Sequence, residues 1–391
     1  MNRATPRMTI LSKAMIFIAA AVVLCNYYYL YFINFSEGDS EGGSLYSLLK
    51  VAGVVLACAT LLRPSINRKY LAENISLLLL IMVATVIFIL KSVALGMSDL
   101  MFLNTAICFI PFFLLREREN NNCVIFFFES CLTIMAFQIA LDTYIFISGL
   151  SIWENKAFIG GLGNPSSFGL VCNILIAYIL FHRKPKATSV LYFAFLSCGV
   201  IMTSSMLSAL SLGIILFAWC LLTLSIKKIA YIIISIIAIP IIVSSLASDH
   251  LLYKITSATN LLSESPTSDS SRSVSLRVEI HKTYANNFEK DPVEGIFYGF
   301  TNSAYIKYDS QVLTYLSSFG MIFTALFFSV ISFTMAKSFM ARNYFSAMLL
   351  FLFSITFATN RILDYYPLPL FFAITFLTTR HYSKRDVANT V

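Results

Sequence analysis

Arg277 and His281 are the first pair of residues whose types and spacing suit a reaction. They are four residues apart and share one face of a helix; on a strand they also share a face, with Glu279 between them. A guanidinium binds phosphate oxygens through paired donors, and an imidazole titrates near neutral pH. The pair, with Arg272 as a weaker second cation, therefore suits a phosphate-bearing lipid substrate. The alternative is that these residues only meet lipid headgroups, as basic residues of interfacial helices commonly do.

Asp309 directly precedes an apolar segment, within the sequence Tyr-Asp-Ser-Gln-Val-Leu-Thr-Tyr-Leu at 308–316. A carboxylate at the start of a membrane helix can act as a general base or bind an acceptor hydroxyl. The structural alternative is that Asp309 or Ser310 is the N-cap of the helix, because both residue types favour that position. The sequence leaves both roles open.

Arg361 lies in a short connection that also contains Asp364. Two explanations are open for an arginine at this position. The first is an ion pair with Asp364 or with a lipid phosphate, and the second is contact with a substrate pyrophosphate.

A glycine-rich run at 160–167, Gly-Gly-Leu-Gly-Asn-Pro-Ser-Ser, could present backbone N–H groups to an anion. A plain connecting turn is the simpler interpretation, because all these residue types favour turns. Asp142 lies inside an apolar segment, where a carboxylate is costly and usually faces a cavity or a partner. Glu129, in the same segment, is closer to its other end.

Several signatures of chemistry are absent from the sequence. There is no Walker A lysine motif, no HExxH and no CxxC, so ATP-driven transport and zinc chemistry have no support. The eight cysteines fall in or beside apolar segments and are interpreted as small packing residues.

The elements that position these residues are membrane helices. The chain of 391 residues is 58% hydrophobic and 12% charged, with a mean hydropathy of +0.77, which fits no soluble class. A helix needs about 20 apolar residues to cross a bilayer. The first apolar segment follows Arg3, Arg7 and Lys13 and is interpreted as a retained span rather than a cleaved signal. We predict an all-α, polytopic membrane protein with about twelve spans, at 14–33, 45–62, 74–95, 100–115, 123–149, 167–182, 188–204, 206–225, 229–247, 311–335, 343–359 and 366–379.

The basic residues predict the orientation of these spans. Alternate connections hold 18 of the 28 lysines and arginines, and cytoplasmic loops are the ones enriched in these residues. Both termini are therefore predicted to be cytoplasmic. Lys50, Lys91, Lys156 and Arg361 are the exceptions in or beside short loops of the opposite side. Because the basic residues form short groups rather than one stripe, nucleic-acid binding is not expected.

One connection is large enough to hold structure of its own. We divide the chain into nine spans at 1–247, a large loop at 248–310, and three spans with a cytoplasmic tail at 311–391. Within the loop, Ser273–Lys290 fits both a strand and a helical period. We favour a helix on the membrane surface, because the four-residue repeat is longer and ends at Asp291-Pro292.

This layout resembles the bacterial O-antigen polymerases (Wzy type) and, more distantly, the O-antigen ligases. The resemblance rests on about twelve spans with both ends inside, a large late periplasmic loop, and local sequence. The local matches are Asn-Phe-Glu-Lys-Asp-Pro-Val-Glu-Gly-Ile at 287–296, Asp309-Ser310 followed by Leu313, Tyr315 and Gly320, and Gly163-Asn164-Pro165. The sequence departs from these families in two places. Where the ligases have a histidine followed by Asn or Ser, this chain has Asp309-Ser310, which resembles the polymerases more, and the family's frequent arginine before the Gly-Asn-Pro turn is missing.

The resemblance implies a metal-independent glycosyltransferase of the inner membrane, without a cofactor. It would pass a glycan from undecaprenyl pyrophosphate to a second lipid-linked repeat unit, in contact with membrane lipid and a chain-length regulator protein. Arg277, Arg272 and Arg361 would then hold the pyrophosphate, and Asp309 or His281 would serve as the base. A lipid-linked sugar flippase or other polysaccharide transporter, a ligase and a non-catalytic scaffold remain the alternatives.

Overall fold

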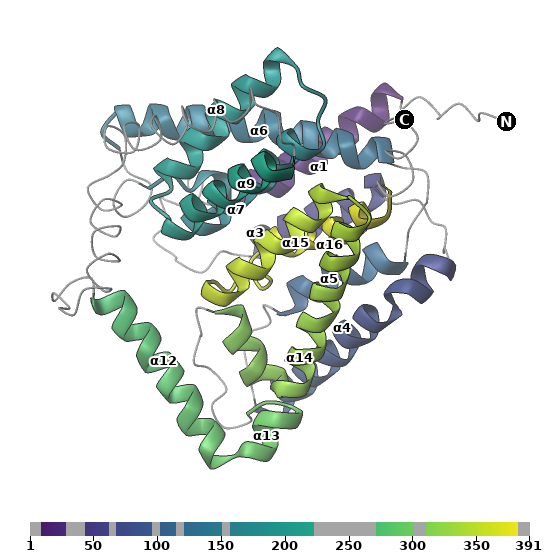
Figure 1. The fold of residues 1–391 in the computed structure, drawn as a ribbon, viewed down its shortest axis with the longest axis vertical. Helices are drawn as coiled ribbons and strands as arrows, with labels where there is room; N and C mark the ends of the chain where they lie inside the picture. Colours follow the sequence, from purple (N-terminus) through teal and green to yellow (C-terminus); the bar gives the residue numbers. More distant parts are fainter. Residues whose placement is uncertain are drawn as a thin grey trace. The chain divides into compact units, whose positions relative to one another are not determined.

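The computed structural model describes residues 9–28, 44–61, 68–95, 102–114, 121–150, 157–222, 271–300 and 310–381. Within these ranges every regular element is a helix (Figure 1). Helices overlap the predicted spans that fall in these ranges: α9 covers Met206–Leu222, whereas α4, at Arg68–Leu95, begins six residues before the predicted start at 74. The predicted ninth span, 229–247, lies outside the described residues.

Three helical segments are long and apolar enough to cross a membrane, namely Asn74–Ala94, Asn122–Ile147 and Gln311–Met340, and several shorter helices are apolar as well. α4 leaves large apolar side chains exposed, including Leu79, Val86 and Leu90. An extended apolar surface of this kind suits contact with lipid rather than with water. The chain is therefore a membrane-embedded protein whose described residues form helices and no strands.

The chain forms two compact units. The first comprises residues 1–19, 50–127 and 272–391, and the second comprises 20–49 and 128–271. Helices α1 (Ile10–Leu24) and α3 (Ser44–Leu61) are each divided between the two units.

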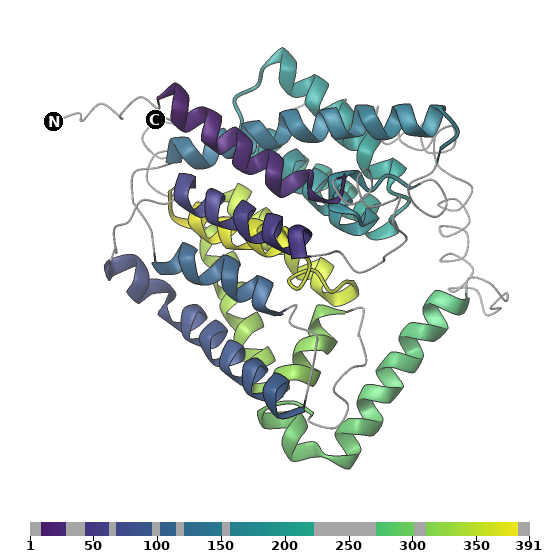
Figure 2. The same cartoon turned by 180° about the vertical axis from the view of Figure 1, so that it is seen from behind.

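In the first unit, α14 (Gln311–Met340) packs on α15 (Tyr344–Thr359) and on α4, while α5 (Phe102–Leu114) packs on α4 and on α16 (Leu368–His381). Figure 2 shows α4 and α5 side by side from behind. Aromatic rings fill the space between these helices. The Phe372 ring centroid lies 4.9 Å from that of Phe353 and 5.2 Å from that of Phe109. Offset aromatic contacts of this length contribute beyond the area they bury.

Helix α14 is broken at Gly320, where the backbone adopts φ 85° and ψ 172°. Within the predicted span at 311–335, residues 311–319 therefore form a short helix, and the long helix begins after the break. Glycine tolerates this positive φ because it has no Cβ. In Figure 1 the two parts of α14 meet beside α13 (Pro292–Phe297).

In the second unit, α7 (Pro165–Phe181) is buried along most of its length and packs on both α8 (Ala187–Met202) and α9. Gly169 of α7 meets α9 so closely that an added Cβ would lie 2.2 Å from the Ser208 hydroxyl oxygen. Small residues commonly allow such close helix contacts in membranes. Between α8 and α9 the chain makes a tight turn at Thr203–Ser205.

All eight cysteines lie in described residues and are free thiols. Five of them are buried among other side chains, which agrees with the packing role predicted for them.

Candidate functional site

Helix α12 (Ser271–Lys290) carries Arg272, Arg277 and His281. The spacing of apolar residues in this segment fitted both a strand and a helix. The helix that we favoured is confirmed. It ends where predicted, because Pro292 starts the next helix, α13. At residues 271–278 only the backbone is described, so Arg272 and Arg277 are placed on α12 by position alone.

Positions 277, 281, 284 and 288 follow one another along one face of α12. At the C-terminal end of this face, the Tyr284 ring lies 5.6 Å from the Phe300 ring, centroid to centroid. Tyr284, at this end of the face, therefore packs on the protein's own chain. His281, one turn earlier, is exposed and makes no hydrogen bond with any described residue.

Asp309 lies outside the described residues, whereas its neighbour Ser310 is the N-cap of α14. The Ser310 hydroxyl oxygen accepts a hydrogen bond from the Leu313 N–H at 3.4 Å and donates to the Phe357 carbonyl at 3.2 Å. Of the two N-caps considered from the sequence, Ser310 therefore fills the position.

Gln311, the first residue of α14, joins the start of this helix to the connection between α15 and α16. Its N–H donates to the Asn360 carbonyl at 3.3 Å, and its side-chain Oε1 accepts from the Leu363 N–H at 2.8 Å. The Gln311 side chain is fully buried, and its Nε2 has no hydrogen-bond partner among the described residues. Because the Leu363 N–H can only donate, Oε1 of Gln311 must face it, and the amide cannot be turned around to pair its nitrogen.

Arg361 and Asp364 form an ion pair in this same connection. The Asp364 side chain is 1% exposed and that of Arg361 is 12% exposed. α5 holds the connection in place, since Asn104 Nδ2 donates to the Asp364 carbonyl at 2.9 Å and the Thr105 hydroxyl to the Leu363 carbonyl at 2.6 Å. The ion pair expected as the simpler explanation of Arg361 is therefore present.

Tyr315 completes this group one helical turn after Gln311. Its side chain is 1% exposed, and its hydroxyl lies within electrostatic range of Arg361 and Asp364. We call Gln311, Tyr315, Arg361 and Asp364 the Gln311–Asp364 cluster. The cluster places a cation, a carboxylate, a hydroxyl and an unpartnered amide nitrogen at the helix start that directly follows Asp309.

The second unit holds its own buried carboxylate, Asp142. Its Oδ1 accepts from the Tyr28 hydroxyl at 2.7 Å and its Oδ2 accepts from the Gly160 N–H at 2.9 Å. The sequence predicted that Asp142 faces a cavity or a partner. It has partners, because its carboxylate accepts hydrogen bonds from Tyr28 and from the start of the glycine-rich run.

Several N–H groups of the glycine-rich run donate within the protein. Gly161 N–H donates to Gln138 Oε1 at 3.1 Å, and Asn164, the N-cap of α7, accepts from the N–H groups of Ser166 and Ser167. The anion held by this run is therefore the chain's own Asp142, and the run acts as a connecting turn.

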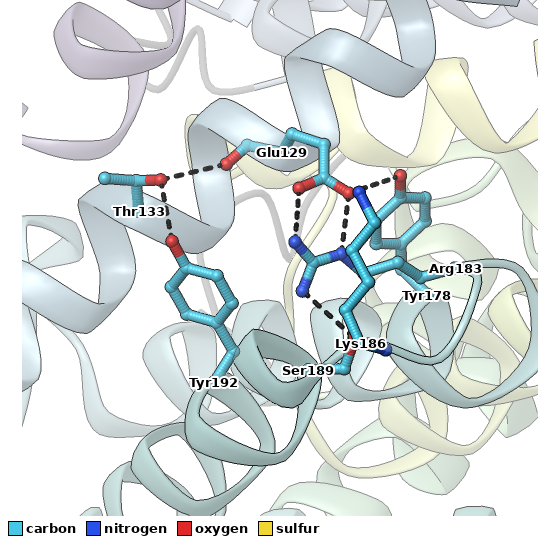
Figure 3. A network of polar contacts seen from close by, with 7 residues as sticks. All are labelled: Glu129, Thr133, Tyr178, Arg183, Lys186, Ser189 and Tyr192. Carbon is cyan, nitrogen blue, oxygen red and sulfur yellow. Dashed lines mark hydrogen bonds and ion pairs between the residues drawn. The ribbon is translucent and has the colours of Figure 1, made fainter.

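Glu129 and Arg183 form a third group of polar contacts (Figure 3). Arg183 donates through Nε at 2.8 Å and Nη2 at 2.9 Å to the two carboxylate oxygens, and the Tyr178 hydroxyl donates to Oε1 at 3.1 Å. The Arg183 guanidinium also lies 5.2 Å from the centre of the Tyr192 ring. This network ties α6 (Asn121–Ile147) to α7 and α8, and its charges neutralise one another.

The structure thus brings Arg361 next to the start of α14, although the two are separated by about fifty residues in the chain. It does not join His281 to them through any contact between described residues. Sequence reasoning missed Gln311 and Tyr315 as members of the group. An amide in the first turn of an apolar helix was the available signal, because such groups are costly in lipid.

No protein-family model matches the sequence, and no curated protein matches it either.

Proposed function

We propose that this chain is an O-antigen polymerase, a glycosyltransferase that acts on lipid-linked glycans at the periplasmic face of the bacterial inner membrane. The donor is a growing glycan on undecaprenyl pyrophosphate, and the acceptor is the non-reducing sugar of a lipid-linked repeat unit. The proposal includes about twelve spans, cytoplasmic termini and a periplasmic loop at 248–310.

One observation carries the proposal: Arg361 and the residues that directly follow Asp309 meet in one buried polar cluster. Gln311 contacts both Asn360 and Leu363, on either side of Arg361. The transfer needs a cation for the leaving pyrophosphate and a base for the acceptor hydroxyl. The cluster supplies the cation, Arg361, beside the helix start that directly follows Asp309.

In the reaction, the acceptor hydroxyl attacks the anomeric carbon of the donor glycan. The new glycosidic C–O bond forms as the bond to pyrophosphate breaks, and undecaprenyl pyrophosphate leaves with the bonding electrons. Asp309 or His281 takes the hydroxyl proton. Arg277, Arg272 and Arg361 balance the charge of the diphosphate, so the transfer needs neither a metal nor a nucleotide.

The unpartnered nitrogen of Gln311 fits a site that binds sugar oxygens. A buried amide donor without a partner costs about 1–3 kcal/mol, so an oxygen that accepts from it is strongly favoured. In this proposal a glycan hydroxyl or an ordered water accepts a hydrogen bond from that nitrogen, and Gln311 orients the acceptor sugar.

A chain-length regulator protein is the expected protein partner of the polymerase.

The Arg277→Ala variant tests the proposal in intact cells. We expect long polysaccharide to be lost while single-repeat products and the amount of protein stay unchanged. Lys282→Ala is the matched control, because Lys282 is exposed and lies about 140° around α12 from position 277. A normal ladder in the Arg277→Ala strain would contradict the assignment.

A lipid-linked sugar flippase is the second candidate, and the deletion strain separates the two. Loss of a flippase traps lipid-linked repeats on the cytoplasmic face. Loss of a polymerase leaves single repeats delivered to the cell surface, which is the result that we expect, whereas loss of a ligase leaves long lipid-linked chains that are not transferred.

A further inference from the structure

The break in α14 leaves carbonyl groups that a continuous helix would use. The last carbonyls of any helical segment have no partner within it. Before the break at Gly320, the Ser317 carbonyl accepts from the Phe300 N–H at 2.8 Å, and the Ser318 carbonyl accepts from the Lys91 ammonium at 3.0 Å. Groups from two other parts of the first unit therefore satisfy these carbonyls.

Lys91 makes three such contacts. Its Nζ donates to the carbonyls of Tyr298 at 2.8 Å, Phe300 at 3.3 Å and Ser318 at 3.0 Å. An ammonium group has three N–H donors, so all three are used. The carbonyl end of a helix also carries partial negative charge, which favours a cation there.

Two glycines allow the backbones to approach this closely. A Cβ at Gly299 would lie 2.3 Å from the Ser317 carbonyl oxygen, and one at Gly320 would lie 2.8 Å from the Tyr298 nitrogen. Both glycines also have positive φ, 79° and 85°. Residues 298–300, which follow α13, therefore lie directly against the break at Gly320, and Lys91 contacts this segment and the carbonyl of Ser318.

We infer that the Lys91 ammonium is a built-in cation that closes the break in α14 and anchors residues 298–300 to it. This role explains why a lysine departs from the charge pattern of the short connections. The anchored segment follows α12 and α13 directly, so Lys91 is a positioning residue for the helix that carries His281. Only this last consequence rests on the proposed glycosyl transfer.

Hydrogen exchange of the purified full-length protein, followed by mass spectrometry, tests the anchor without any glycan. Lys91→Met keeps an unbranched side chain but removes the ammonium group. The Phe300 amide should then exchange at least about tenfold faster, because Lys91 no longer ties the carbonyls of Tyr298 and Phe300 to that of Ser318, beside the Ser317 carbonyl that the Phe300 N–H binds. Lys337→Met is the matched control, since Lys337 lies at the other end of α14 and its side chain makes no hydrogen bond with any described residue. Equal exchange at residues 298–300 in Lys91→Met and the wild type would overturn the inference.

Chemical rescue covers the case in which Lys91→Met unfolds more widely. In Lys91→Ala, propylammonium should restore slow exchange at 298–300, whereas neutral propanol should not, because the carbonyls need a cation with several N–H donors. Restoration by both compounds, or by neither, would show that the charge is not what holds the segment. The polysaccharide ladder of Lys91→Met, measured separately, reports on the positioning role alone.

Discussion

Gln138 and Gln311 are both fully buried glutamines, one in each unit, and they use their amides differently. Gln138 accepts from the Gly161 N–H through Oε1 and donates through Nε2 to the Leu24 carbonyl at 3.0 Å. Gln311 accepts from Leu363, but its Nε2 has no partner among the described residues.

The neighbouring carboxylates extend this contrast. Asp142, beside Gln138, accepts from a tyrosine hydroxyl and a backbone N–H, which join α6 to the glycine-rich run. Asp364, beside Gln311, pairs with an arginine. The polar group of the second unit thus holds the fold together, whereas the Gln311–Asp364 cluster keeps a charged pair and a spare donor. Spare buried capacity of this kind is expected where a ligand binds.

The largest expected effect is at the ion pair of the cluster. Arg361→Met should lower the free energy of unfolding by about 3–5 kcal/mol, because it leaves a buried carboxylate unpaired. The double variant Arg361→Met/Asp364→Leu should recover most of that stability without recovering long polysaccharide. Thermal unfolding in detergent and the ladder in cells measure the two quantities. If the double variant recovers both stability and long polysaccharide, the ion pair has only a structural role, and the two units do not differ in the way proposed.

Asp142→Ala should come next in size. It leaves the Tyr28 hydroxyl and the Gly160 N–H without their acceptor, at a cost of about 2–4 kcal/mol for the two groups. We expect less folded protein but a normal ladder for the protein that folds. A shortened ladder at equal protein amount would place Asp142 in the site and reverse the comparison.

Substitution of each glutamine by leucine compares the units directly. Gln138→Leu should cost about 1–3 kcal/mol, because the Gly161 N–H, the Leu24 carbonyl and the Cys25 sulfur lose their hydrogen bonds to the amide. Gln311→Leu should change stability by less than about 1 kcal/mol, since it removes one bond together with one unpartnered donor. The ladder should shorten only for Gln311→Leu. Equal losses of stability would indicate that the Gln311 nitrogen is satisfied after all.

A small effect is also expected at Glu129, whose side chain is 32% exposed, although that of its partner Arg183 is only 9% exposed. Glu129→Gln should cost about 1 kcal/mol, because glutamine still offers Arg183 an acceptor oxygen but no charge. Melting in low and high salt provides the measurement, because screening weakens such a pair in the wild type. Lost activity in this variant would give the network of Figure 3 a role beyond structure.

The fold was predictable where local pattern decides it. Long apolar segments specify helices, and so α9 and α15 begin within one residue of the predicted spans at 206 and 343. The break at Gly320 was not predictable. An isolated glycine in an apolar run is compatible with a straight helix, and only the approach of the Tyr298 backbone decides otherwise.

The candidate site was predictable in part, through residues that break a rule. Arg361 departs from the charge pattern of the short connections, and its partner Asp364 was visible three residues later. Gln311 was hidden, because its contacts with Asn360 and Leu363 join distant segments. Patterns along the chain do not specify such pairings.

By itself, the sequence determined an all-helical, membrane-embedded chain, because lipid leaves a long apolar segment few alternatives to a helix. It also marked Lys91 and Arg361 as exceptional charges. Only the tertiary structure decided what those charges do: Lys91 meets three carbonyls at a broken helix, and Arg361 lies beside the start of α14. The physical reason is that buried polar groups must find partners, and which partners are in reach depends on how the helices pack.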